Sequence, residues 1–383
     1  MNSASSNRHV TVIILIDALG WEIAQRFNFC RELLPRAGVT DTVLGYSSAA
    51  IPSLLSGQPP SSHGIWAMYR YDPARSPFRF FRRLPRLPHA LEWRARVATK
   101  WVLRKRNTVR GYYNLYEIPL DVLGYFDVAG RGDPYQPGGL KAETLFDALT
   151  RKRVDYRVWN YQTAEADNLA ALQAELAGDS KVLFFYTAEL DALMHRKGIF
   201  HDDVERKLAR YEEHVDVILR AAEALGKRAS VYLFSDHGMT NVDKVVDLMS
   251  VVEEWGYGPA SGLLAFYDST MARFWCDGGT RNDLVERLNQ TGWGYVIPDS
   301  ELERFGCRFA DRSYGDVIFL LSPGHLIVPS FMGRAPLAAM HGYHPDDSYS
   351  KSCFMTNVDS GTLPKSILEL KSYLLGRIGE DVQ

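Results

Sequence analysis

The chain has 383 residues, of which 46% are hydrophobic and 23% are charged, and its formal net charge is −2. This composition is typical of a soluble globular protein with a large core, and a charge so near zero does not favour a polyanionic partner. No segment approaches the roughly 18 apolar residues of a membrane-spanning helix, so we predict none.

The N-terminus and the cysteines indicate an intracellular protein. Residues 1–9 lack a basic start followed by a long apolar core, so we expect no secretory signal. The four cysteines are scattered and form no CxxC pair, as is usual for reduced thiols: Cys30, Cys276, Cys307 and Cys353. We therefore expect a cytoplasmic location.

Short apolar runs alternate with amphipathic segments along the chain. The runs predict buried strands at Val10–Ile16, Lys181–Thr187, Ser230–Phe234 and Val317–Leu321, and a strand-like segment at Asp41–Tyr46. Helical periodicity predicts helices at Thr163–Leu176, Asp203–Leu225, Arg281–Asn289 and Lys365–Arg377. This alternation predicts an α/β fold with a mostly parallel central sheet and helices on both faces. In such sheets, ligands bind at the carboxyl ends of the strands.

One segment interrupts this alternation. Between Arg75 and Arg110 there are twelve Arg or Lys residues and one acidic residue, Glu92, with aromatic residues among them. We interpret residues 66–135 as a basic, aromatic-rich cap inserted over the active-site face, and residues 257–313 as a second small cap. The catalytic core is then predicted to comprise residues 1–65, 136–256 and 314–383.

Carboxylates and histidines follow several of the predicted strands. Asp17 comes directly after the first strand, and Asp236-His237-Gly238 follows the strand at 230–234. Asp191 and His195 are four residues apart, so a helix would present both on one face. Each has a structural alternative: a helix N-cap for Asp17, an ordinary turn for Asp236-His237-Gly238, and a surface polar pair for Asp191 and His195.

Two further segments carry polar groups suited to chemistry. Ser47 and Ser48 open a run of small residues that suits a nucleophile at a helix start, where free backbone N–H groups favour an anionic phosphate. His341-Gly342-Tyr343-His344 is typical of a loop rather than a core. Taken together, two aspartates with one histidine and a serine oxygen can hold one cation, and one aspartate with two histidines can hold another. Two such ions can clamp the attacking and leaving oxygens of a phosphoryl displacement.

From Asp17 to about Phe354, the motifs of this sequence resemble those of the alkaline phosphatase superfamily. Within it, they resemble the nucleotide pyrophosphatase/phosphodiesterase branch. The carrying motifs are Asp17, Ser47 with Gly57 and His63-Gly64-Ile65, Asp191-x-x-x-His195-x-x-Gly198, Asp236-His237-Gly238-Met239 and His341-Gly342-Tyr343. The resemblance implies that Ser47 is the catalytic nucleophile, with Ser48 as the alternative register. It also implies metal ligands at Asp17, Ser47, Asp191, His195, Asp236, His237 and His341.

The sequence departs from the branch at one position. Met68 stands where the branch often has a phosphate-binding Asn, although Tyr71-Asp72-Pro73 downstream still match. We predict that Arg70 or another cap cation replaces this donor. Met68, Arg70 and His344 are therefore the predicted substrate contacts, with the role of His344 left open.

The resemblance implies a metal-dependent phosphodiesterase or nucleotide pyrophosphatase that forms a phosphoseryl-type intermediate on a small-molecule phosphoester. The mixed nitrogen and oxygen ligand set favours two zinc ions, with manganese as the alternative. A phosphomonoesterase or phosphotransferase with the same metal centre, and a non-catalytic binding protein on the same fold, are the alternative functions.

The basic insertion at 75–110 has three interpretations. It can be a solvated cap, it can bind additional phosphates or an acidic substrate tail, or it can lie on an anionic membrane surface. For the third, Leu91, Trp93, Val97, Trp101 and Val102 lie among Arg94, Arg96, Lys100 and Arg104. No motif indicates sequence-specific nucleic-acid binding, and the sequence does not determine an oligomeric state.

Overall fold

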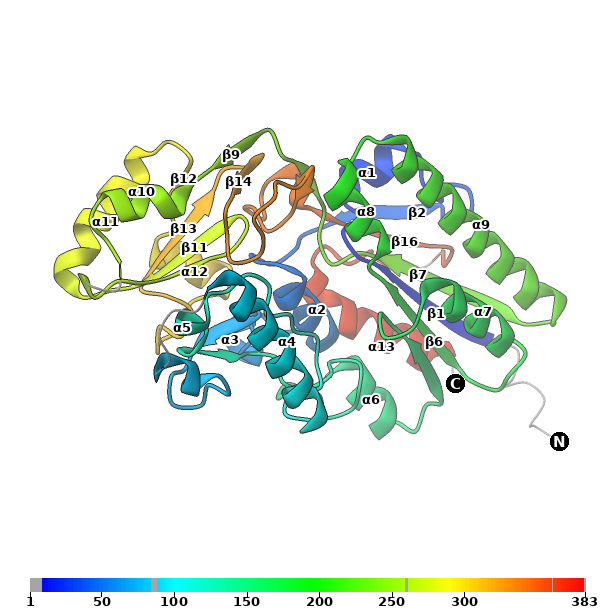
Figure 1. Cartoon of the computed structure of the whole chain (residues 1–383). Coiled ribbons are helices and arrows are strands. Elements are labelled where there is room, and N and C mark those ends of the chain that lie inside the picture. The colour runs from blue at the N-terminus through cyan, green and yellow to red at the C-terminus, as the bar shows by residue number, and fades with distance from the viewer. Residues whose placement is uncertain (1–8, 84–87, 259–260, 360, 382–383) are drawn as a thin grey trace.

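The computed structural model describes residues 9–83, 88–258, 261–359 and 361–381 (Figure 1). Residues 1–8, on which the expectation of no secretory signal mainly rests, and residues 84–87 of the basic insertion lie outside these ranges. In the described part of the chain, no helix is both long and apolar enough to cross a bilayer.

A six-stranded sheet in the order β2-β16-β7-β1-β6-β5 forms the centre of the molecule. The inner strands run parallel, and β16 alone is antiparallel to its two neighbours, which confirms the predicted mostly parallel sheet. The strands are β1 (His9–Ile16), β2 (Arg36–Thr40), β5 (Tyr156–Trp159), β6 (Val182–Thr187), β7 (Arg228–Phe234) and β16 (Ser352–Thr356).

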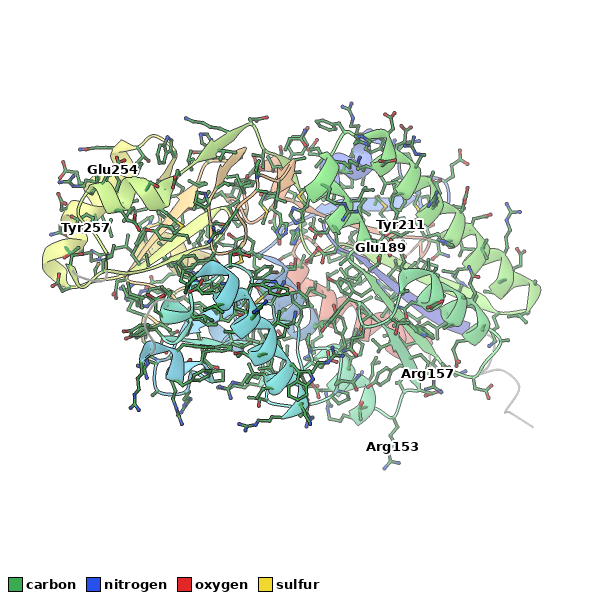
Figure 2. The ribbon with its side chains drawn as sticks, viewed as in Figure 1. Arg153, Arg157, Glu189, Tyr211, Glu254 and Tyr257 are labelled. Carbon is green, nitrogen blue, oxygen red and sulfur yellow. The ribbon has the colours of Figure 1, made fainter. Side chains whose placement is uncertain are left out.

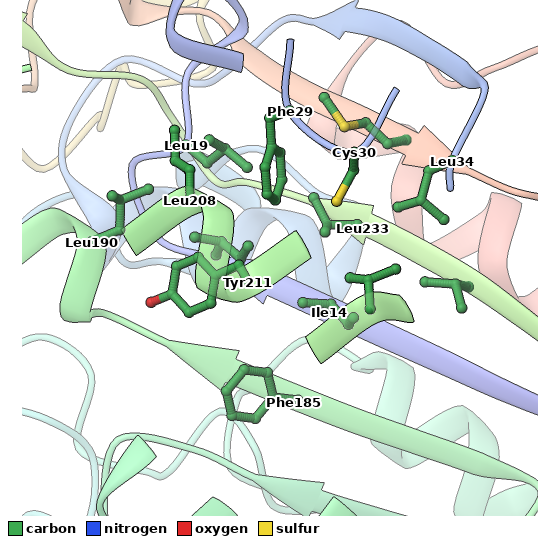
Figure 3. Packing of buried hydrophobic residues seen from close by; sticks show 14 of the residues in the cluster. Ile14, Leu19, Phe29, Cys30, Leu34, Phe185, Leu190, Leu208, Tyr211 and Leu233 are labelled. Atoms are coloured by element: carbon green, nitrogen blue, oxygen red, sulfur yellow. The ribbon is translucent and has the colours of Figure 1, made fainter. Parts of the chain in front are cut away.

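Helices cover both faces of this sheet, because its strands are apolar on both sides. Along β1, Val12 and Ile14 alternate with Ile13 and Leu15 between two separate core clusters. Figure 3 shows the first cluster, in which Tyr211 lies near Ile14, Phe185 and Leu233 of the sheet. That face carries α1 (Trp21–Arg26), α7 (Glu165–Glu175), α8 (Glu189–Lys197) and α9 (Asp202–Ala224). The other carries α2 (Ser47–Ser56), α6 (Leu145–Arg151) and α13 (Leu370–Asp381).

A second, antiparallel sheet lies at the opposite end of the molecule from α9 (Figure 1). Its strand order is β10-β11-β13-β12. It consists of β10 (Leu264–Tyr267), β11 (Met271–Trp275), β12 (Gly294–Val296) and β13 (Val317–Leu321), with α10 (Leu248–Glu254), α11 (Gly278–Gln290) and α12 (Asp299–Arg304) nearby. The run at 317–321 is therefore a strand as predicted, but it belongs to this small sheet and not to the central one.

The first insertion forms a compact unit around a two-stranded ribbon. It contains β3 (Tyr69–Tyr71), the short 3₁₀ helix η1 (Arg79–Arg83), α4 (His89–Lys105), α5 (Leu120–Leu123) and β4 (Phe126–Val128). Its apolar side chains, including Phe78, Leu103 and Phe126, share one cluster with the small sheet. Short elements complete the fold: α3 (Pro60–His63), β8 (Thr240–Asn241), β9 (Lys244–Val246), β14 (His325–Ile327), β15 (Ala339–Met340), η3 (Ser348–Ser350) and η4 (Ile367–Glu369).

The prediction of a strand at Asp41–Tyr46 is wrong, because the strand lies in the preceding segment. The strand is β2, which ends at Thr40, and residues 41–46 form an irregular connection into α2. Gly45 has φ +128°, a conformation that breaks an extended strand, and α2 begins two residues later at Ser47. The turn is what makes Ser47 the first residue of a helix.

Candidate active site

The first group of ligating side chains consists of Asp17, Asp236 and His237. Their potential ligand atoms lie within 4.8 Å of one another. Nε2 of His237 is 3.2 Å from Oδ2 of Asp236 and 3.5 Å from Oδ1 of Asp17. All three side chains are buried. The structure thus brings together three of the predicted metal ligands.

Neighbouring parallel strands explain this convergence. β1 and β7 pair in parallel and end at the same edge, so Asp17 and Asp236 leave the sheet side by side. Ala18 turns sharply with φ 62°, and its N–H donates to Oδ1 of Asp236 (3.2 Å). A non-glycine residue with positive φ is a strained position of the kind that clusters at functional sites.

Gly238 permits a close backbone approach. A Cβ at this position would lie 2.0 Å from the carbonyl oxygen of Tyr349. Gly238 does not have a positive φ, so the close packing against Tyr349 is the reason that the structure gives for a glycine here.

The second group consists of Asp191, His195 and His341, whose ligand atoms also lie within 4.8 Å of one another. Asp191 and His195 project from one face of α8, with His195 Nε2 3.2 Å from Asp191 Oδ1. His341 follows β15 and brings Nε2 to 3.5 Å from the same oxygen. Nδ1 of His195 lies 2.8 Å from the carbonyl oxygen of Ala339, which ties α8 to β15.

A polar network anchors α8 to α9. Lys207 on α9 binds Glu189, the first residue of α8, at 2.6 Å, and it also binds Glu165 of α7. Tyr211 donates to Glu165 at 2.6 Å. Glu189 and Tyr211 are close together in Figure 2. The helix that carries Asp191 and His195 is thereby fixed at its N-terminal end.

The two groups meet through their histidines. The rings of His237 and His341 stack with centroids 4.0 Å apart, and His195 lies 5.2 Å from His341. The two groups therefore form one continuous site, which suits two cations acting on one substrate.

Ser47 lies at the edge of the first group. Its Oγ is 2.9 Å from Nε2 of His237 and 3.5 Å from Oδ1 of Asp17. It is the first residue of α2, and the N–H groups of Ala49 and Ala50 already bond to the carbonyl of Tyr46. Within the described residues, no hydrogen bond joins Ser48 to either group.

The electrostatics of the site call for added positive charge. Burial raises the pKa of Asp17 well above its usual value, and the neighbouring Asp236 and Asp191 raise it further. Burial also raises the pKa of Asp236. Burial, together with His237 and His195, lowers the pKa of His341. These shifts show carboxylates that lack counter-charge beside an imidazole that resists protonation.

Several site atoms also lack hydrogen-bond partners. Oδ2 of Asp236, Oδ1 of Asp191 and Nδ1 of His341 are buried and have no hydrogen-bond partner in the described part of the chain, although Nε2 of His237 and of His195 lies 3.2 Å from the respective carboxylate oxygen. Buried polar atoms without a partner are rare in folded proteins and require an explanation. Divalent cations supply one, because neutral imidazoles and carboxylates in sets of three suit zinc or manganese. The residues therefore fit the metals that the sequence predicted.

Three predicted substrate contacts have other partners. Arg70 on β3 forms ion pairs with Asp127 (3.3 Å) and Asp72 (3.7 Å), so its charge is already balanced. The sulfur of Met68 accepts a hydrogen bond from the N–H of Asn114 (3.4 Å). His344 binds Glu301 of α12 at 2.6 Å and belongs to neither metal-ligating group.

Two groups that no sequence motif indicates support the site. Tyr186, near the end of β6, donates to Oδ2 of Asp17 at 2.6 Å. Thr270 hydrogen-bonds to Tyr46, directly before Ser47, and to the carbonyl of His341 (3.2 Å). The position of Tyr186 near a strand end was the only available signal, and Thr270 lies in a segment with no motif.

Comparison with known proteins identifies the family. The sequence matches the family described as type I phosphodiesterase / nucleotide pyrophosphatase over residues 11–342. The chain belongs to this family. It is accordingly a hydrolase of the phosphodiesterase/pyrophosphatase type, as its motifs predicted. No curated protein matches the sequence significantly.

Solved structures of the family have the same fold. Murine ectonucleotide pyrophosphatase/phosphodiesterase 5, in an inactive form in complex with AMP, is 14% identical with a TM-score of 0.68. The human protein of the same name is 12% identical with a TM-score of 0.66. In both cases the match covers 97% of this chain and 95% of the other.

Proposed function

We propose that the protein hydrolyses a phosphodiester or pyrophosphate bond in a nucleotide-like small molecule, with Ser47 as nucleophile and two divalent cations. The observation that most directly supports this proposal is the position of Ser47 Oγ. It lies at a helix start and within 3.5 Å of both His237 Nε2 and Asp17 Oδ1. That the similar murine structure holds AMP supports a nucleotide-type substrate.

Each group would hold one ion. Asp17, Asp236 and His237, together with Ser47, would bind the first, and Asp191, His195 and His341 the second. The mixed imidazole and carboxylate donors favour zinc over manganese. Bound there, the cations would lower the pKa of the Ser47 hydroxyl and neutralise charge on the phosphoryl oxygens.

The chain's own residues then carry out a two-step displacement. Ser47 Oγ forms a bond to phosphorus while the ester bond opposite it breaks and the leaving alcohol or phosphate departs. The free N–H groups at the start of α2 would donate to the phosphoryl oxygens. Water then cleaves the phosphoseryl intermediate from the opposite side and restores the hydroxyl.

A matched pair of serine variants tests the nucleophile. We expect Ser47→Ala to lower kcat by about 10³-fold or more while keeping its bound metal, because the attacking atom is lost. Ser48→Ala has the same chemistry one residue on and should stay within about threefold of wild type. Activity retained in Ser47→Ala, or lost in Ser48→Ala, would reject Ser47.

A substrate panel tests the reaction class and the metals. Chelator-treated protein should be inactive on bis(p-nitrophenyl) phosphate and recover with zinc, less so with manganese, with metal content measured by mass spectrometry. Faster turnover of p-nitrophenyl phosphate than of the diesters would favour the phosphomonoesterase alternative. Metal-loaded protein inactive on every ester would indicate the non-catalytic alternative.

A further inference from the structure

The outer face of α4 is unusual for a surface helix of a soluble protein. Trp93, Val97 and Trp101 follow one another at four-residue spacing and are 57%, 51% and 61% exposed. Residues four apart lie on one face of a helix, so these side chains form a continuous apolar stripe. Leu91, two residues before Trp93, is also exposed. Two tryptophans more than half exposed on one helix indicate a surface that is covered in use.

Basic side chains surround this stripe. Arg94, Lys100, Arg104, Lys105 and Arg106 are all exposed. Within the described part of the chain, none of these five forms an ion pair with a carboxylate. Lys105 lies over the ring of Trp101, with Nζ 4.9 Å from its centroid. The acidic residue of the segment, Glu92, faces inward and pairs with Arg96 (3.5 Å). The outer face is therefore both apolar and strongly cationic.

The inner face of α4 is firmly held. Arg96 is buried and donates to the carbonyl oxygen of Ile118 and to Glu117, both at 3.2 Å. Leu103 is buried in the cluster that the cap shares with the small sheet. Tyr113 donates to the carbonyl oxygen of Lys100 at 3.2 Å. These contacts hold the helix in place without a partner, and Figure 1 shows it at the front of the first insertion.

We propose that α4 docks the protein on an anionic membrane surface. Trp93, Val97 and Trp101 would enter the headgroup region, where tryptophan is favoured, while the arginines and lysines contact lipid phosphates. Their long stems allow the charged ends to reach the phosphates beside a buried apolar stripe. This proposal does not depend on the identity of the nucleophile or of the substrate.

The mixture of residues favours a bilayer over a protein partner. The buried centre of a protein interface is depleted in charged residues, lysine in particular. Here Arg94 and Lys105 lie on the same side of α4 as Trp101, so a protein covering the tryptophan would bury those charges as well. The whole chain carries a net charge of −2, so attraction to anionic lipid must come from this local cluster, which also sets the orientation.

Vesicle co-sedimentation of the full chain tests the proposal. We expect pelleting with phosphatidylcholine vesicles that contain 30% phosphatidylglycerol, little with phosphatidylcholine alone, and release in 0.5 M NaCl, because the lipid attraction is screened by salt. Tryptophan fluorescence should shift to the blue on binding, as the indole rings leave water.

Two double variants separate the contributions. Trp93→Ser/Trp101→Ser and Arg94→Gln/Arg104→Gln should each lower the partition coefficient by about tenfold or more. The matched control is Val217→Ser/Arg220→Gln, which removes an exposed apolar and an exposed basic side chain from α9 and should bind like wild type. Circular dichroism and turnover of a soluble diester should be unchanged in all three.

Several results would overturn the proposal. These are no pelleting with anionic vesicles, pelleting that salt does not reverse, or pelleting that the α4 variants leave unchanged. A dimer in sedimentation velocity that the tryptophan variants dissociate, without vesicle binding, would assign the stripe to a second copy of the chain instead.

Discussion

The chemistry of Asp17 depends on the repulsion between its carboxylate and the carboxylates beside it. Asp17 is buried beside Asp236 and Asp191, and both neighbours add to the effect of burial in raising its pKa. Without added positive charge, the folded protein must therefore either bury unbalanced negative charge or take up protons. This arrangement favours metal binding over the stability of the metal-free state.

Replacing Asp17 with Asn tests whether this carboxylate binds metal and destabilises the metal-free protein. At pH 7 a carboxyl whose pKa is raised on folding destabilises the folded state, so its neutral isostere should stabilise the metal-free protein by about 1 kcal/mol or more. The same variant should lose one equivalent of bound metal and most of its activity. Urea denaturation of chelator-treated protein measures the first effect, and metal analysis the second.

Asp268→Asn is the matched control. Asp268 is also buried, but it binds the guanidinium of Arg273 at 2.8 Å. Burial raises the pKa of Asp268 too, but removing its charge, unlike that of Asp17, leaves a buried arginine without its partner, so Asp268→Asn should lower the free energy of unfolding by about 3 kcal/mol. If Asp17→Asn lowered the stability of the metal-free protein as Asp268→Asn does, the repulsion argument would be wrong.

At the scale of elements, the site depends on how the carboxyl ends of the strands are packed. The segment after β7 carries Asp236 and His237 and passes within contact distance of η3, where Gly238 faces the carbonyl oxygen of Tyr349. A side chain there forces one of the two backbones to move. Because the adjacent residue is His237, the displacement reaches the first ligand group directly.

Gly238→Ala should therefore damage both stability and metal binding. We expect a loss of about 2 kcal/mol or more in the free energy of unfolding, since the methyl group meets backbone and not a movable side chain. Gly333→Ala is the control, because a Cβ there meets nothing within 4 Å. Thermal melts and metal content of the two variants check the prediction, and equal behaviour would refute it.

Short sequence patterns indicated several of the residues that the structure brings together. Contacts between residues far apart in the sequence could not be predicted from such patterns. The positions of Asp17 and Asp236 after apolar strands, and the four-residue spacing of Asp191 and His195, are visible in short windows of sequence. The ion pair of Arg70 with Asp127, which lies 57 residues away, is not visible in any short window. The sheet to which Val317–Leu321 belongs depends on pairing with β11 and β12, which no local pattern reveals.

At the scale of the whole molecule, the central and small sheets share buried side chains. On β13, Leu320 packs into the cluster on the α2 face of the central sheet, whereas the adjacent Phe319 packs into the cluster of the cap. A single strand thus contributes to two cores through its alternating faces. The two sheets cannot separate without exposing these side chains.

We therefore expect the protein to unfold as one unit. Calorimetry of the metal-free protein should give a single transition whose van't Hoff and calorimetric enthalpies agree. Leu320→Ala should lower the temperature of the whole transition, since it removes a buried side chain at the junction. Two resolved transitions, or an effect of Leu320→Ala on only one of them, would show that the units are independent.

The ligand groups draw on points far apart along the chain, from Asp17 to His341. During synthesis the ribosome releases Asp17 and Asp191 long before His341. These two residues therefore leave the ribosome before the second group is complete. A translation product that stops before residue 341 can present Asp191 and His195 but cannot complete their group. With the proposed two-metal site, retention of both ions would distinguish chains that extend past residue 341 from interrupted ones, and metal capture would be one of the last events in the making of the protein.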